Sequence, residues 1–87
     1  MRDHALFDKI DLHLIRVLHT VLTERNVSKA AIRLGMHQPA VSAALKRLRE
    51  IFDDPLFVKD KQRMVPTERA QQLEPSVRME CTLKKTV

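Results

Sequence analysis

The chain has 87 residues, of which 44% are hydrophobic, and its sixteen Lys and Arg against eleven Asp and Glu give a formal net charge of +5. This length supports one domain with a modest core, and the apolar content is too high for a chain that is disordered throughout. No apolar run approaches the roughly 20 residues that span a bilayer, and a single cysteine, Cys81, excludes an internal disulfide and a cysteine-rich metal site. The positive charge suggests a polyanionic partner without identifying one.

The first predicted helix covers residues 12–25, "LHLIRVLHTVLTER". Asp11, just before it, can accept hydrogen bonds from the free backbone N–H groups of the first turn. His13 and His19 lie six residues apart, the wrong interval for two metal ligands on one helical face, so we expect both to be structural. Apolar residues at helical spacing predict a broad buried face: Leu14, Ile15, Leu18, Val21 and Leu22.

The second predicted helix begins at Ser28, a favourable N-cap, with Val27 and Ile32 in the two positions of a hydrophobic staple. Gly35, the only glycine of the chain, follows this helix as a left-handed stop. With only about two turns, the helix must pack on another element to be stable. Three apolar residues are expected to face its neighbours: Ala31, Ile32 and Leu34.

The third predicted helix starts around His37–Pro39, because proline fits the first turn of a helix, where the N–H that it lacks has no partner. Apolar residues at intervals of three and four mark its core face: Val41, Ala44, Leu45, Leu48, Ile51 and Phe52. At about 100° per residue, the opposite face is small near its start and cationic further along. That face carries Pro39, Ser42, Ala43, Lys46 and Glu50, flanked by Gln38, Arg47 and Arg49.

After Pro55 the pattern changes, and "LFV" and "MV" are short strand candidates on either side of the polar loop "KDKQR". Thr67 can cap a last helix that runs towards the C-terminus, and Pro75 predicts a kink or a break in it. An apolar stripe marks one side of this helix: Ala70, Leu73 and Val77.

Three helices and a small hairpin predict a mainly α fold, a winged helix-turn-helix with a two-stranded wing and a C-terminal helix. A tight turn at Gly35 would set the third helix at a steep angle, so that its start can enter a DNA major groove. Gln38 carries an amide that can bond adenine, and Ser28 and Ser42 suit phosphate oxygens. Cations on the helix and in the loop would neutralise the DNA backbone: Lys46, Arg47, Arg49, Lys59, Lys61 and Arg63.

Each of these residues also has a simpler explanation. The basic helix residues can form a solvated face, Ser28 can be only a cap, Pro39 only a helix starter, and the loop lysines can protect an edge strand. Only the joint arrangement favours DNA. A competing hypothesis is a protein-interaction module that pairs with an intact regulator and blocks it. An enzyme is disfavoured, because a Gly-rich phosphate loop, a His-Glu-x-x-His motif and a nucleophile beside a base are all missing, and no cofactor is expected.

The segment "NVSKAAIRLGMHQPAVSAALKRLREIFDDPLFVK" resembles the DNA-binding region of LysR-type transcriptional regulators. The shared features are Ser-x-Ala-Ala, Gln-Pro-Ala-Val-Ser, the leucines Leu45 and Leu48, and Pro-Leu-Phe before the wing. The pattern "DDPLFVK…M-x-P-T-x-R-A-x-x-L" resembles the branch with regulators of aromatic degradation and of nodulation. The resemblance runs from about Asp8 to Val77. It implies a DNA-binding domain at 8–66 in a bacterial cytosol, with the helix-turn-helix at about 26–45, the wing at about 55–66 and a linker helix at 67–87.

The resemblance also implies roles for particular residues. The start of the third helix would read the major groove of double-stranded DNA, through Gln38, Pro39, Ala40 and Ser42. Ser28 would contact backbone phosphate, and Lys59 with the rest of the wing would contact the minor groove or flanking phosphates. The linker helix would pair with a second copy in antiparallel fashion, with three interface candidates: Ala70, Leu73 and Val77.

The sequence departs from the family at several points. His37 stands where Ser or Thr is usual, Ala43 replaces a polar or basic residue, and Lys59 replaces an Arg whose planar fork a Lys cannot reproduce. LysR-type regulators continue into a longer effector-binding domain, whereas this sequence ends at Val87. We therefore expect no small-molecule effector to bind this chain and only weak dimerisation, whether it is a fragment, a truncated reading frame or a stand-alone relative.

Overall fold

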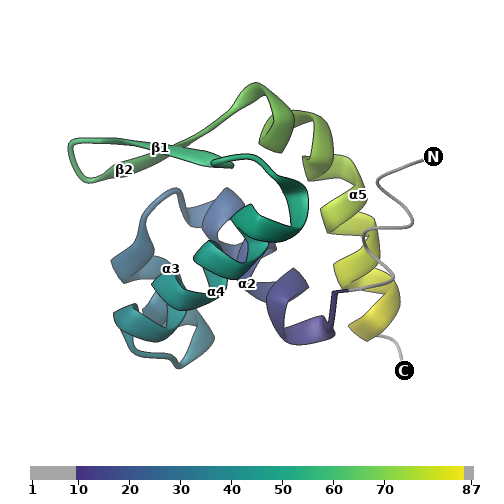
Figure 1. The fold of residues 1–87 in the computed structure, drawn as a ribbon. Helices are drawn as coiled ribbons and strands as arrows, with labels where there is room; N and C mark the ends of the chain where they lie inside the picture. Colours follow the sequence, from purple (N-terminus) through teal and green to yellow (C-terminus); the bar gives the residue numbers. More distant parts are fainter. Residues whose placement is uncertain (1–9, 86–87) are drawn as a thin grey trace.

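The computed structural model describes residues 10–85 and shows a mainly helical fold with one two-stranded antiparallel sheet (Figure 1). The elements are α2 (Leu12–Glu24), α3 (Val27–Leu34), α4 (Gln38–Phe52), β1 (Phe57–Asp60), β2 (Arg63–Pro66) and α5 (Glu68–Lys85). Helix α2 packs against α3, α4 and α5, while the hairpin of β1 and β2 extends away from α5 (Figure 1). The predicted winged helix-turn-helix with a C-terminal helix is confirmed. Of the predicted domain ranges, residues 8–9 and 86–87 lie outside the described part. No helix within residues 10–85 combines the length and the apolar character that crossing a membrane requires.

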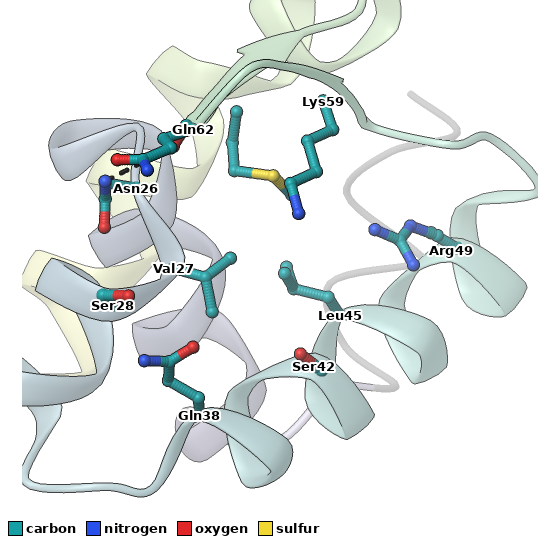
Figure 2. A pocket seen from close by; sticks show the side chains of 10 residues that line it. Asn26, Val27, Ser28, Gln38, Ser42, Leu45, Arg49, Lys59 and Gln62 are labelled. Atoms are coloured by element: carbon teal, nitrogen blue, oxygen red, sulfur yellow. Dashed lines mark hydrogen bonds between the residues drawn. The ribbon is translucent and has the colours of Figure 1, made fainter.

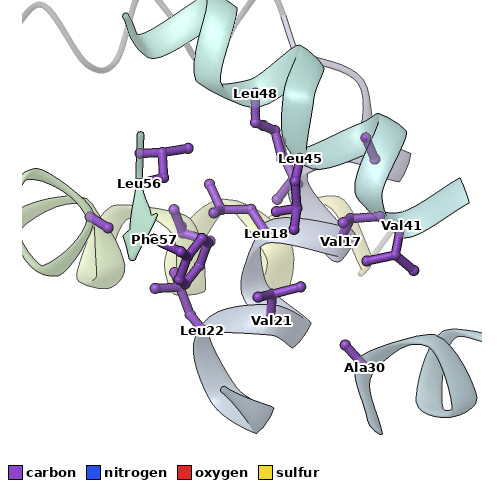
Figure 3. Close-up of a cluster of buried hydrophobic side chains, with 14 of the residues drawn as sticks. Val17, Leu18, Val21, Leu22, Ala30, Val41, Leu45, Leu48, Leu56 and Phe57 are labelled. Carbon is purple, nitrogen blue, oxygen red and sulfur yellow. The ribbon is translucent and has the colours of Figure 1, made fainter. Parts of the chain in front are cut away.

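Helix α2 begins and ends as its sequence predicts. The Asp11 side chain accepts a hydrogen bond from the Leu14 backbone N–H at 2.9 Å, and Arg25 ends the helix in a left-handed conformation with φ 57°. The predicted buried face of α2 is confirmed, although Leu14 is only half-buried. Val17, which was not predicted, is also buried. This face supplies much of the core in Figure 3, where Leu18 lies among Leu45, Leu56 and Phe57 from α4 and the wing.

Helix α3 begins earlier than predicted. Asn26, not Ser28, is the N-cap, because its side chain accepts a hydrogen bond from the Lys29 backbone N–H at 2.9 Å. With the cap two residues earlier, Val27 and Ile32 no longer stand at staple positions, and the predicted staple is wrong. Ile32 is 81% exposed rather than packed on a neighbour. The fully buried residues of α3 are Ala30 and Ala31, whose small side chains permit close approach to α2 and α4. Leu34 packs against the core as predicted, and so does Val27, both partly buried.

The bend between α3 and α4 depends on Gly35, as predicted. Gly35 is left-handed with φ 67°, and its N–H donates to the Ile32 carbonyl at 3.1 Å. The Met36 N–H donates to the Ala31 carbonyl at 2.9 Å, which completes a Schellman motif. Helix α4 then begins after His37, whose side chain makes no capping hydrogen bond. Its predicted core face is confirmed, with Ile51 half-buried at the margin.

The wing is a short hairpin whose strands pair Phe57 with Pro66 and Lys59 with Met64. The predicted strands are confirmed, but they extend into the predicted loop, which leaves Lys61 and Gln62 as the turn. Lys61 accommodates the turn with φ 60°. The hairpin is joined to the α2–α3 connection, because the Met64 N–H donates to the Arg25 carbonyl at 2.9 Å.

Helix α5 is capped as predicted, since Thr67 Oγ1 accepts a hydrogen bond from the Ala70 N–H at 3.1 Å. Of the kink or break predicted at Pro75, the break is wrong, because one helix runs from Glu68 to Lys85. Pro75 lies on the exposed side, where water can bond the carbonyl oxygen that proline leaves unpaired.

The predicted dimer interface on α5 needs correction. Ala70, Leu73 and Val77 are at most 1% exposed, because their side of α5 packs against α2 within the same chain. Cys81 continues this buried stripe as a free thiol. These residues are core residues and are not exposed to a second copy. The large apolar side chains that α5 does expose are Met79, at 63%, and Leu83, at 58%.

Candidate nucleic-acid interface

A cleft of about 450 Å³ lies between the wing on one side and α3 with α4 on the other (Figure 2). Two of its lining residues, Leu45 and Met64, are buried core residues and form an apolar floor. The lining contains two cations and no acidic residue. The full lining is Asn26, Val27, Ser28, Gln38, Ser42, Leu45, Arg49, Lys59, Gln62 and Met64. The cleft is therefore a positively charged groove with a narrow apolar base.

The start of α4 supplies one wall of this cleft. Gln38 and Ser42 are both exposed and lie one turn apart on the side of α4 that faces the cleft (Figure 2). Within residues 10–85, neither side chain hydrogen-bonds another group, so both are available to a ligand. Pro39 and Ala40 are also exposed, and their small size leaves the beginning of the helix unobstructed. All four residues that were predicted to read the major groove are therefore exposed at the surface.

Ser28 lies across from Gln38, at the start of α3 (Figure 2). Because Asn26 caps the helix, the Ser28 hydroxyl has no capping role. Its side chain is exposed, and in the described part of the chain it makes no hydrogen bond. The simpler explanation of Ser28 as an N-cap is wrong.

Two of the six predicted cations enter the cleft, from opposite walls. Arg49 extends from α4 and Lys59 from β1, and Figure 2 shows both side chains directed into the same space. Arg49 is half-buried, and its Nε donates to the Pro55 carbonyl at 3.0 Å. This bond fixes the guanidinium while its two terminal nitrogens remain available.

The other four predicted cations do not line the cleft. Lys46 and Arg47 are exposed further along α4, and Lys61 is exposed in the hairpin turn. Arg63 pairs with Asp60 in the sheet register, one position beyond the Lys59–Met64 pair, which places it on the other face of the wing. All four are exposed charges outside the cleft.

Two polar residues that line the cleft were not predicted from the sequence, Asn26 and Gln62. The Asn26 amide Nδ2 donates to the Gln62 backbone carbonyl at 3.3 Å, so the cap of α3 also holds the tip of the wing. Asn26 could have been identified as an alternative N-cap two residues before Ser28. No local signal marks Gln62, because its place depends on how the hairpin folds back. No group of three or more His, Cys, Asp or Glu within residues 10–85 is arranged to hold a metal ion.

Comparison with known proteins identifies relatives over most of the chain. Residues 12–71 match the family model of the bacterial regulatory helix-turn-helix protein, lysR family. Nodulation protein D of Rhizobium leguminosarum bv. trifolii is 46% identical over 72 residues, which are 83% of this chain and 23% of that protein. Nodulation protein D 1 of Rhizobium meliloti (strain 1021) is 44% identical with the same coverage. The chain thus spans about a quarter of the length of these relatives.

Solved structures share the same fold. The probable transcriptional regulator PA0477 from Pseudomonas aeruginosa superposes with a TM-score of 0.80 at 41% identity, over 86% of this chain and 25% of that one. The BenM DNA-binding domain in its complex with catB site 1 DNA superposes with a TM-score of 0.81 at 19% identity, over 88% of this chain and 86% of that one. The second likeness shows the fold alone. The family match covers well over half of the chain and confirms the resemblance that the sequence suggests. The domain that matches is the DNA-binding domain of a transcription regulator and is not an enzyme. This chain therefore belongs to the lysR family of bacterial regulatory helix-turn-helix proteins.

Proposed function

We propose that this chain binds double-stranded DNA in a sequence-specific manner as part of transcription regulation, with the start of α4 in the major groove. The observation that carries the proposal is the exposed start of α4 beside a cleft with two cations and no acidic lining residue. The BenM domain, which has the same fold, is in complex with DNA, and we extend that mode of binding to this chain.

Base recognition is assigned to Gln38 and Ser42. The Gln38 amide can donate to N7 and accept from N6 of an adenine at the same time, a pairing that tells adenine from the other bases. Ser42, one turn later, can donate to or accept from a neighbouring base edge. Pro39 and Ala40 contribute by their small size, which lets the helix backbone approach the groove floor.

Phosphate binding is assigned to the cleft. A sugar-phosphate strand that separates the major from the minor groove would pass between α4 and the wing, where it meets Arg49 and Lys59. Ser28 would donate to a phosphate oxygen from the α3 side. Lys46, Arg47, Lys61 and Arg63 add positive charge around this path. Affinity should then fall by orders of magnitude as salt rises from roughly 50 to 200 mM.

A second copy of the chain would pair through the exposed side of α5, where Met79 and Leu83 lie one turn apart. This apolar patch is small, so we expect the homodimer to be weak. The same patch supports the second candidate function, in which α5 pairs with a full-length regulator and blocks it. Under that alternative, changes at the start of α4 would have no effect on activity.

Selection from a random duplex library followed by fluorescence anisotropy tests the DNA proposal. We expect Gln38→Ala and Ser42→Ala each to weaken binding to the selected site by roughly 5- to 100-fold, the range of one base contact. Gln72→Ala, an exposed change on α5, is the matched control and should have no effect. Equal binding by all three variants would contradict the assignment of α4 to base recognition.

A further inference from the structure

We propose that Asp54 is a positioning residue for DNA binding and that it acts through Arg49. Asp54 does not line the cleft, but its N–H bonds the backbone of Arg49, which does. In this proposal, which depends on the DNA-binding function proposed above, Asp54 fixes the short segment between α4 and β1. That segment presents the carbonyl oxygen that orients the Arg49 guanidinium into the cleft.

The hydrogen bonds of Asp54 join three elements. Its Oδ2 accepts from the Leu56 N–H at 2.8 Å and from the Thr67 hydroxyl at 2.8 Å. Its own N–H donates to the Arg49 carbonyl at 3.2 Å. One carboxylate oxygen thus connects the entry to the wing with the start of α5, and the backbone of the same residue bonds the last turn of α4.

The segment that Asp54 holds has an unfavourable backbone conformation. Asp53 and Leu56 have φ values of 51° and 65°, in the left-handed region that side chains other than glycine rarely adopt. Leu56 stays there because its side chain is fully buried and its N–H is bonded to Asp54. Without the carboxylate, this segment would lose two of its hydrogen bonds and would relax more readily.

Pro55 lies between these two residues, and its carbonyl oxygen is the contact for Arg49. That oxygen accepts from Arg49 Nε at 3.0 Å and from the Phe57 N–H at 2.7 Å. An arginine side chain has many rotamers, so a fixed acceptor at Nε removes much of the freedom that DNA binding would otherwise have to restrict. Relaxation of Pro55 would therefore release Arg49 without removing its charge.

Simple electrostatics predicts the opposite effect for the same residue. Asp54 is negatively charged and lies close to the expected path of a polyanion, so its removal alone should strengthen DNA binding. A positioning role predicts that its removal weakens binding. Asp53 is the matched control: it is the adjacent carboxylate, it is exposed, and its side chain makes no hydrogen bond within residues 10–85. Asn tolerates the left-handed backbone at this position.

The test is fluorescence anisotropy of the full chain with a labelled duplex of mixed sequence, over a series of salt concentrations. We expect Asp54→Ala to weaken binding several-fold and to lower the slope of log affinity against log salt by up to about one, the share of one phosphate contact. Asp53→Asn should bind at least as tightly as the unchanged chain. If Asp54→Ala binds as tightly as Asp53→Asn, the proposal is wrong.

A double-mutant cycle separates positioning from a general loss of folding. In an Arg49→Gln background, Asp54→Ala should cause little further loss, because the residue through which it acts is gone. Equal losses in both backgrounds would overturn the proposal.

The binding measurements are made at a temperature at which circular dichroism shows every variant to be folded. If Asp54→Ala does not fold, Thr67→Val replaces it in the same cycle, with Thr67→Ser expected to restore binding. An unchanged chain that does not bind the duplex would overturn the proposed function as well, whereas normal binding with additive losses overturns this inference alone.

Discussion

Asn26 and Gln62, 36 positions apart in the chain, are joined by a hydrogen bond of 3.3 Å from the Asn26 amide to the Gln62 carbonyl, so the start of α3 and the tip of the wing are held together. The same Asn26 caps α3 through its Oδ1. One residue therefore both caps a helix and bonds the tip of the wing across the cleft.

These two roles can be separated by substitution. Asn26→Asp keeps an oxygen for the cap but loses the donor to Gln62, so stability should be retained while amide hydrogen exchange at Met64 becomes faster. Asn26→Ala loses both bonds and should lower the free energy of unfolding by about 1 kcal/mol. Thermal unfolding with site-resolved hydrogen exchange measures both effects. Slow exchange at Met64 in Asn26→Asp would show that the wing is held without this bond.

A comparison of Ile32 with Ile15 tests whether the Ile32 side chain is exposed. Ile32 is 81% exposed and Ile15 is fully buried, so the same change to Ala should have very different effects. Ile15→Ala should lower the free energy of unfolding by about 2–5 kcal/mol, whereas Ile32→Ala should change it by less than about 0.5 kcal/mol. Urea unfolding measures both. A large loss for Ile32→Ala would mean that its side chain is covered in solution.

Gly35 should resist substitution for backbone reasons alone. A Cβ at Gly35 would meet nothing within 4 Å, yet φ is 67°. Gly35→Ala should therefore lower the free energy of unfolding by about 1–2 kcal/mol through left-handed strain. Gly35→Asn should lose less, since Asn tolerates this conformation. If Gly35→Ala is as stable as the unchanged chain, the backbone at residue 35 is not left-handed in solution.

Lys59 and Lys61 lie two residues apart on the wing, but only Lys59 lines the cleft. Lys59→Gln should weaken binding to any duplex and lower the salt slope by about one, whereas Lys61→Gln should change the slope less. Anisotropy at several salt concentrations gives both slopes. Indistinguishable slopes for the two variants would place the phosphate path outside the cleft.

The two sides of α5 should respond differently to charge. Met79→Asp should reduce self-association in analytical ultracentrifugation without unfolding the chain, because Met79 is exposed. Leu73→Asp places a carboxylate in the core between α5 and α2 and should unfold the domain. A folded Leu73→Asp variant would contradict the packing of α5 on α2. Unchanged self-association in Met79→Asp would place any dimer contact elsewhere.

Much of the fold could be predicted from spacing, because Asp11, Gly35 and Pro39 act locally and the helices have clear apolar stripes. The start of α3 could not, since Asn26 and Ser28 have similar capping propensities and a long-range bond to Gln62 distinguishes them. The stripe of Ala70, Leu73 and Val77 indicated a buried face but not what buries it. The cleft depends on where the hairpin lies relative to α3, where Met64 bonds Arg25 and Gln62 bonds Asn26, and no local pattern encodes these long-range contacts.

The central place of α2 has a consequence for how the molecule can be divided. Helix α5 covers one side of α2 with a stripe that reaches from Ala70 to Cys81, so a chain cut after Pro66 would leave that side of the core open to water. Helix α5, which was predicted to be a linker helix, is thus part of the folded domain and covers its core. The shortest piece of this chain that folds autonomously should extend at least to Cys81.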